Sequence, residues 1–245
     1  MDRERIYIYG KHALKEALLH KPKAVQKVFL SSQTHDEELF GLLKKAGIKP
    51  AELTGNTLKK GGAEDASHQG VIALISAGAL VKPYEEFVKT LSVKRETALV
   101  LLDEIQDPHN VGAIIRSAAA FGIAGVLIPQ HNQAPITGAV VKVSAGMAFR
   151  VPLVAIGNVN TTLRDLKERG FWIYALAGEA EKSIGDEKFD APAVFILGNE
   201  SAGIREKTKE TADILLKIPI DPRCESLNVA ASAAVVFYAW RTKNT

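Results

Sequence analysis

The feature that most constrains the fold is a series of short apolar runs, separated by helical patterns, in the C-terminal part of the chain. From Thr97 onward the runs read ALVLLD, GVLIP, RVPLVAI, FWIYALAG, AVFILG and DILLKIPI. Segments with helical periodicity separate them, including NVGAIIRSAAAFG, 137–147, VNTTLRDLKERG and GIREKTKETA, and a last helix is expected over 227–240. Near-continuous apolar runs of this length are typical of strands buried on both faces. The sequence therefore predicts a doubly wound α/β domain with a parallel sheet.

A smaller α/β pattern precedes this domain. It contains a helical pattern over 13–19, a strand VQKVFLS, a helix DEELFGLLKKAG and a strand GVIALIS. The segment GALVKPYEEFVKTLSVKR lacks clear strand periodicity and predicts a linker with one short helix. We therefore expect a small domain over 1–76, a linker over 77–95 and the parallel-sheet domain over 96–245.

Composition narrows the class of protein. Hydrophobic residues at 47% and charged residues at 24% argue against a disordered or fibrous chain. No apolar run approaches the roughly 20 residues of a membrane helix, and MDRERIYIYG does not resemble a signal peptide, so we expect a cytoplasmic protein with no membrane partner. The single cysteine, Cys224, excludes an internal disulfide and a Cys-rich zinc site. Since the six histidines form no pair with metal-ligand spacing, we predict no metal.

The charge distribution permits a polyanionic partner without requiring one. The net charge is +3, a mild basic excess. Basic residues crowd the first quarter of the chain, at Arg3, Arg5, Lys11, Lys15, Lys21, Lys23, Lys27, Lys44, Lys45, Lys49, Lys59 and Lys60. By charge alone, a solvated face and a nucleic-acid-binding surface explain this cluster equally well.

Parallel sheets of this kind bind ligands in the loops at the carboxyl ends of their strands. Four such loops are polar or rich in glycine: DEIQDPHN, AGEAEKS, GNESAG and DPRCESLN. None has the GxGxxG pattern of dinucleotide-binding proteins. GNESAGIR has the glycine spacing of a phosphate-binding loop, but Ile204 and Arg205 stand where lysine and serine or threonine are needed. The chain also lacks the GxSxG of a serine hydrolase.

These loops and the segments beside them carry five candidate polar side chains: Asn110, Arg116, Glu200, Ser226 and Asn228. Asn110 stands where a helix is expected to begin, so an N-cap is one interpretation. Arg116 falls among small apolar residues, where a cation needs a partner or an anionic ligand. Glu200 could stabilise the N-terminus of a helix opening at Gly203. Ser226 or Asn228 could cap the last helix.

Three segments resemble, in order and spacing, the three sequence motifs of the SpoU family of the SPOUT class. They are LDEIQDPHNVGAIIRSAAAFG, VFILGNESAGI and IPIDPRCESLNVAASAAVVFYAW. IYGKHALKEAL and SHQGVIAL are similar to the small RNA-binding domain, likened to a ribosomal protein fold, that precedes the catalytic domain in many members. The resemblance thus covers nearly the whole chain. One departure is Ser201, where a glycine commonly follows the glutamate of the second motif.

The resemblance implies an RNA ribose 2'-O-methyltransferase that uses S-adenosylmethionine. It implies a C-terminal trefoil knot, made where the chain from about 195 to 228 threads through itself, although chains usually avoid knots. Its pattern assigns the cofactor contacts to Leu176, Gly178, Gly198, Ile218, Leu227 and Asn228. A glycine at 198 suits close approach of the backbone to a ligand. The family also implies a homodimer with the cofactor pocket near the subunit interface, and the final helix NVAASAAVVFYAW suits either that interface or an ordinary core.

The resemblance also implies roles for the candidate polar residues. It places Arg116, with Asn110, at the RNA backbone and target ribose, and Glu200, Ser226 and Asn228 nearby. Transfer requires in-line attack of the hydroxyl oxygen on the methyl carbon and removal of the hydroxyl proton. Because a guanidinium keeps its proton, we expect Arg116 to clamp a phosphate and stabilise the developing alkoxide. We expect Glu200 to accept the proton, directly or through a water.

The N-terminal domain resembles that of members which act on large-subunit ribosomal RNA, with guanosine as the target. The basic N-terminal residues would add affinity through phosphates, and the 2'-hydroxyl distinguishes RNA from DNA. Two alternatives are a transfer RNA methyltransferase of the same family and a catalytically silent RNA-binding or ribosome-assembly protein. The N-terminal domain argues against the first, and the presence of Asn110, Arg116 and Glu200 argues against the second.

Overall fold

The computed structural model describes residues 5–55, 57 and 68–244, so Arg3, Lys59 and Lys60 of the basic cluster lie outside the described residues. The chain forms two compact units. The first comprises Met1–Val81 and Ile136–Arg150, and the second comprises Lys82–Pro135 and Val151–Thr245. The segment 136–150 therefore belongs to the first unit, although it lies within the sequence range 96–245. No helix in the described part of the chain combines the length and apolarity needed to cross a bilayer.

The first unit is built on a four-stranded sheet with the order β1-β4-β2-β3. These strands are β1 (Arg5–Tyr9), β2 (Val25–Leu30), β3 (Ala51–Glu52) and β4 (Val71–Ser76). β4 is antiparallel to both β1 and β2, and β3 is parallel to β2. The helices are α1 (Lys11–His20), the short 3-10 turn η1 (Pro22–Ala24), α2 (Glu37–Lys45) and α4 (Ala77–Leu80). The strands and helices expected from the sequence over 6–75 are confirmed.

The segment that joins the first unit from later in the chain contains α7 (Gly138–Val143) and the 3-10 turn η2 (Met147–Phe149). Its backbone comes so close to β1 that a Cβ added at Gly138 would lie 2.0 Å from the carbonyl oxygen of Tyr7. Arg150 donates two hydrogen bonds of 2.5 and 2.8 Å to the buried carboxylate of Glu16 in α1. Hydrogen bonding to Arg150 lowers the pKa of Glu16. Close backbone packing and an ion pair to a buried carboxylate thus fix this segment in the unit.

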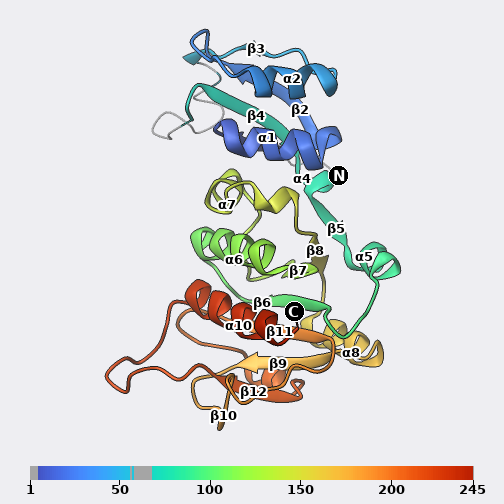
Figure 1. Cartoon of the computed structure of the whole chain (residues 1–245), viewed down its shortest axis with the longest axis vertical. Coiled ribbons are helices and arrows are strands. Elements are labelled where there is room, and N and C mark those ends of the chain that lie inside the picture. The colour runs from blue at the N-terminus through green and yellow to red at the C-terminus, as the bar shows by residue number, and fades with distance from the viewer. Residues whose placement is uncertain (1–4, 56, 58–67, 245) are drawn as a thin grey trace. The chain divides into compact units, whose positions relative to one another are not determined.

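The second unit is a parallel sheet covered on both faces, which confirms the predicted fold class (Figure 1). The strand order is β10-β12-β9-β11-β6-β7-β8-β5, and every assigned pair from β6 to β12 is parallel. The strands are β5 (Val81–Pro83), β6 (Ala98–Asp103), β7 (Gly125–Pro129), β8 (Leu153–Ile156), β9 (Trp172–Leu176), β10 (Lys182–Ser183), β11 (Ala193–Gly198) and β12 (Ile214–Lys217).

The helices of this unit are α5 (Tyr84–Thr90), α6 (Pro108–Phe121), α8 (Val159–Glu168), α9 (Glu206–Lys209) and α10 (Val229–Lys243). α5 and α8 cover one face, where Phe87, Leu163 and Leu166 join the cluster formed by the central strands. α6 and α10 lie side by side on the other face (Figure 1), and Phe237 of α10 meets Phe195 of β11 with ring centroids 6.1 Å apart. Burial on both faces explains the near-continuous apolar runs.

Two local predictions are wrong. The segment 77–95 was expected to contain one short helix, and it contains two, α4 and α5, with strand β5 between them. β5 was missed because its three residues include a proline, which leaves no alternating pattern and is compatible with the sheet edge that it occupies. The pattern GIREKTKETA forms only the four residues of α9.

Candidate active site

A cavity of about 490 Å³ lies at the carboxyl ends of β9, β11 and β12, where a parallel sheet is expected to bind its ligand. Its wall comes from the turns that follow these strands and from the start of α10. The structure brings together here all six residues expected to contact the cofactor: Leu176, Gly178, Gly198, Ile218, Leu227 and Asn228. Glu200 and Ser226 line the same cavity. Turns far apart in the sequence thus form one wall.

The turn after β11 folds back tightly on itself. Asn199 and Gly203 exchange two backbone hydrogen bonds of 2.9 Å. A Cβ added at Gly198 would lie 2.3 Å from the carbonyl carbon of Gly203 and 2.4 Å from the backbone nitrogen of Ile204. The chain's own backbone therefore demands a glycine at position 198, whereas the sequence had suggested the approach of a ligand.

A chain of hydrogen bonds joins the start of α6, the turn after β11 and the start of α10. Asn110 Nδ2 donates to Glu200 Oε1 over 2.8 Å, and Asn228 Nδ2 donates to Asn110 Oδ1 over 2.9 Å. Asn228 Oδ1 accepts hydrogen bonds from the backbone nitrogens of Ala230 and Ala231, which makes Asn228 the N-cap of α10. Because Asn228 donates to its oxygen, the amide of Asn110 must point its nitrogen at Glu200. Three segments of chain thus hold one carboxylate in place.

Two structural interpretations of these residues are wrong. Asn110 does not cap α6, since Asp107 stands at that position and accepts from the backbone nitrogen of His109 over 2.8 Å. Asn110 lies inside the first turn and is buried. Glu200 does not stabilise a helix opening at Gly203, because α9 begins only at Glu206. The expected cap at the last helix is confirmed for Asn228, and Ser226 makes no hydrogen bond with the described residues.

Arg116 lies apart from this network. It is six residues beyond Asn110 on α6, which places it ~9 Å further along the helix axis and on a different side of the helix. Its side chain is exposed, so the expectation that core packing forces it to find a partner is wrong. It forms no hydrogen bond or ion pair with any described residue and does not line the cavity. The guanidinium therefore has no ionic partner among the described residues.

The ion pair that holds the turn after β11 has no local signature in the sequence. Asp103, the last residue of β6, is completely buried and binds Arg205. Hydrogen bonding to Asp103 raises the pKa of Arg205. In the sequence, Arg205 is distinguished only by its position, where a phosphate-binding loop would carry a serine or threonine hydroxyl. Within the described residues, no group of three or more His, Cys, Asp or Glu side chains is arranged to hold a metal ion.

A family model described as the SpoU rRNA methylase family matches residues 97–238. The chain belongs to the SpoU rRNA methylase family. A second model, for the substrate-binding domain of RNA 2'-O-ribose methyltransferases, matches residues 7–80 of this SpoU chain. The resemblance inferred from the three motifs is thus confirmed, and the protein is an RNA ribose methyltransferase by family.

Curated SpoU relatives match almost end to end. The chain is 34% identical over 236 residues to the 23S rRNA (guanosine-2'-O-)-methyltransferase RlmB of Vibrio parahaemolyticus, covering 95% of this chain and 94% of the relative. It is 36% identical over 241 residues to the protein of the same name from Pseudomonas putida, covering 94% of each.

Solved SpoU structures share the fold. The methyltransferase AviRb from Streptomyces viridochromogenes, in complex with the cofactor AdoMet, matches with a TM-score of 0.83 at 22% identity, over 98% of this chain and 90% of that one. The TrmH/SpoU tRNA modifying enzyme of A. aeolicus matches with a TM-score of 0.56 at 24% identity, over 65% of this chain and 81% of that one.

Proposed function

We propose that this chain transfers the methyl group of S-adenosylmethionine to the ribose 2'-hydroxyl of a guanosine in large-subunit ribosomal RNA. The observation that carries the proposal is that Asn110 joins Glu200 to Asn228 by hydrogen bonds, and that both of these residues line a cavity together with all the expected cofactor contacts. One site then contains the cavity for the methyl donor, the proton acceptor and the amides that orient this acceptor. A single-step methyl transfer needs all of them together.

The cavity suits the methyl donor in size and lining. Its volume of about 490 Å³ lies within the range of roughly 300–1,000 Å³ that is usual for small-molecule sites. Leu176, Ile218 and Leu227 offer apolar surface for an adenine ring, and Leu227 is 40% exposed. The glycine-bearing turns leave backbone groups accessible for the polar ends of the molecule. When bound, S-adenosylmethionine supplies a methyl group activated by its sulfonium.

Glu200 accepts the hydroxyl proton, directly or through a water. One of its oxygens already accepts from Asn110, and the other makes no hydrogen bond with the described residues. Asn110, fixed by Asn228, holds the carboxylate in one orientation. Ser226 lines the same cavity and can orient the ribose through its hydroxyl.

Arg116 binds an RNA phosphate and stabilises the alkoxide that develops as the proton leaves. Its exposed guanidinium, which has no partner among the described residues, supports this role. Since it lies away from the cavity of its own subunit, the RNA or a second subunit must bring the phosphate and the reacting ribose to it.

We propose that the chain acts as a homodimer, with a trefoil knot over about 195–228. The surface formed by α6 and α10 supports the dimer, because Val235 and Tyr238 of α10 are 38% and 60% exposed and Tyr238 packs edge-on against Phe121. Exposed apolar surface of this kind is typical of an interface. The strand order, with β9 lying between β11 and β12, supports the knot.

The choice of ribosomal RNA rests on the relatives. Those named for guanosine methylation of 23S rRNA match 94–95% of this chain, whereas the tRNA modifying enzyme matches 65% of it. The substrate-binding match over 7–80 coincides with the basic first quarter of the chain. We retain 1–76 as the substrate-binding domain, 77–95 as the linker and 96–245 as the catalytic domain. We expect the enzyme to act in the cytoplasm, where bacterial ribosomes are assembled.

Mapping of 2'-O-methyl groups tests the proposal. When RNA from cells with and without the gene is compared, the methylation of one guanosine in large-subunit ribosomal RNA should differ, and transfer RNA should be unchanged. A difference in transfer RNA alone would replace the substrate. No difference in any RNA, together with no calorimetric affinity for S-adenosylmethionine or its demethylated product, would favour the silent RNA-binding protein.

The substitution Arg116→Ala tests the site. We expect turnover with ribosomal RNA to fall at least 100-fold, because the phosphate and the alkoxide lose their counter-charge. Affinity for S-adenosylmethionine, measured by calorimetry, should change less than about twofold, since Arg116 does not line the cavity. Wild-type turnover would remove Arg116 from the mechanism.

A further inference from the structure

A completely buried carboxylate lies beside the candidate site but outside the expected catalytic set. Asp103 ends β6, and its side chain has no exposed surface. Its Oδ1 accepts from Nε and Nη2 of Arg205 over 2.9 and 2.5 Å, and its Oδ2 accepts from the backbone nitrogen of Arg205 over 3.1 Å. Arg205 Nη1 also lies 3.1 Å from Glu104 Oε1. One arginine thus binds two consecutive carboxylates at the end of a central strand.

Both ends of the turn that carries Glu200 are bound where β6 ends. At the start, Asn199 Nδ2 donates to the backbone oxygen of Glu104 over 2.8 Å, and Asn199 Oδ1 accepts from the backbone nitrogens of Ser201 and Ala202. At the other end stands Arg205, bound to Asp103. Glu200 therefore projects from a short turn whose two ends are bound to two consecutive residues, the last residue of β6 and the residue that follows it.

The partner of Glu200 is attached to the same strand end. Asn110 belongs to α6, which begins at Pro108, five residues after Asp103. The hydrogen bond between Asn110 and Glu200 thus connects two segments that are both fixed at the end of β6. Movement of the turn relative to β6 would break this bond and displace the carboxylate.

We propose that Asp103 and Arg205 are positioning residues that hold Glu200 in the orientation needed to accept the proton. The proposal rests on the proposed function, since it requires Glu200 to act on the hydroxyl. Arginine suits the task because its planar guanidinium donates several hydrogen bonds in a fixed geometry, which the ammonium of lysine does not. A misplacement of about 1 Å costs on the order of 100-fold in rate when the geometry of reaction is tight.

The test is Arg205→Gln in the full-length protein, with turnover, the KM values for both substrates and calorimetric affinity for S-adenosylmethionine as readouts. We expect kcat to fall about 30- to 100-fold, with affinity for S-adenosylmethionine within about threefold of wild type. Arg205→Lys should restore thermal stability more than turnover. The matched control is Arg169→Gln, since Arg169 binds Asp165 through the same Nε and Nη2 atoms in the same unit but away from the cavity. That control should keep wild-type kcat.

Coupling to Glu200 separates positioning from stabilisation. In a Glu200→Gln background, measured by single turnover, Arg205→Gln should lower the rate less than about twofold further, because it acts through Glu200. An equal effect in both backgrounds, or wild-type kcat in Arg205→Gln, would overturn the positioning role. If Glu200→Gln alone keeps wild-type turnover, the proposed role of Glu200 fails instead.

A second variant covers the case in which Arg205→Gln does not fold. Arg205→Gln leaves the buried carboxylate of Asp103 without a counter-charge, which is strongly destabilising. The double variant Asp103→Asn, Arg205→Gln removes both charges and keeps groups that can hydrogen bond. We expect it to unfold at a higher temperature than Arg205→Gln and still to show reduced kcat; a folded double variant with wild-type kcat would contradict the proposal.

Discussion

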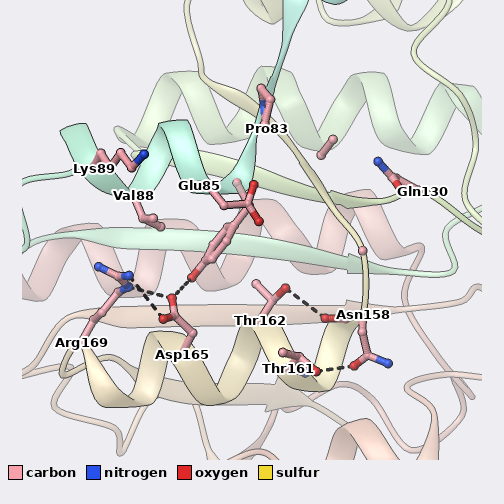
Figure 2. A pocket seen from close by; sticks show the side chains of 13 residues that line it. Pro83, Glu85, Val88, Lys89, Gln130, Asn158, Thr161, Thr162, Asp165 and Arg169 are labelled. Carbon is pink, nitrogen blue, oxygen red and sulfur yellow. Dashed lines mark hydrogen bonds and ion pairs between the residues drawn. The ribbon is translucent and has the colours of Figure 1, made fainter. Parts of the chain in front are cut away.

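Two cavities of the second unit differ in size and in chemistry. The larger, of about 760 Å³, lies between α5 and α8 and includes the turn after β8 (Figure 2). The smaller, of about 490 Å³, is the candidate active site. In the larger one, Asp165 is matched by a cation, because Arg169 donates to it over 2.7 and 3.3 Å, and Tyr84 donates its hydroxyl over 2.5 Å. The two charges of this trio are paired with each other, and the hydroxyl of Tyr84 ties α5 to α8.

Glu200, which lines the smaller cavity, has no such cation among the described residues. Glu200 accepts one hydrogen bond from a neutral amide, and no ion pair joins it to the described residues. Glu200 lies on a turn, and its partner Asn110 lies 90 residues earlier in the chain and accepts in turn a hydrogen bond from Asn228. A carboxylate without an ion-pair partner therefore indicates a functional site better than the volume of the cavity does. Charges that are paired with each other stabilise the fold and are not available to bind a ligand.

The sharpest way to break this comparison is to neutralise each carboxylate. Glu200→Gln should lower turnover about 10²- to 10⁴-fold, because an amide cannot accept the proton. Asp165→Asn should keep turnover within about twofold, since its hydrogen bonds serve α5 and α8. Both are measured with labelled S-adenosylmethionine and ribosomal RNA. Equal losses would mean that both cavities serve the reaction.

The glycines of the two cavities provide the next comparison. Gly198→Ala should lower the free energy of unfolding by about 1–3 kcal/mol, because the new Cβ would overlap the backbone of Gly203 and Ile204. Affinity for S-adenosylmethionine should fall with it, because the turn must shift into the cavity. Gly157 lines the larger cavity, has nothing within 4 Å of an added Cβ and serves as the control. Gly157→Ala should change the unfolding free energy by less than about 0.5 kcal/mol in urea titrations. A Gly198→Ala variant as stable as Gly157→Ala would show that the turn yields easily.

The sequence predicted what depends on local patterns. Apolar runs buried on both faces predicted the parallel sheet, and the motifs predicted which turns line the cavity. It missed what depends on contacts between distant residues. Arg205 binds Asp103, which lies 102 positions earlier in the chain, and neither residue stands out in its own segment. Gly138 contacts Tyr7, so 136–150 joins the first unit, although its helical pattern resembles those of the second. The N-cap interpretation of Asn110 was wrong because Asp107, three residues earlier, offers an equally good acceptor.

The smallest expected effect is the pH dependence of the ion pair in the larger cavity. Hydrogen bonding to Arg169 lowers the pKa of Asp165 in the folded protein. A carboxyl with a lowered folded-state pKa contributes stability above its unfolded pKa of about 3.9, and this contribution is lost as the pH falls through the folded value. The difference in unfolding free energy between wild type and Asp165→Asn should therefore be larger at pH 7 than at pH 3. Because Asp165 is partly exposed, solvent screens the pair and the change should be small. Urea titrations at both pH values measure it. A difference that stays constant with pH would mean that Asp165 stabilises α5 and α8 through its hydrogen bonds alone. Pairing with a cation would then not distinguish the larger cavity from the candidate active site.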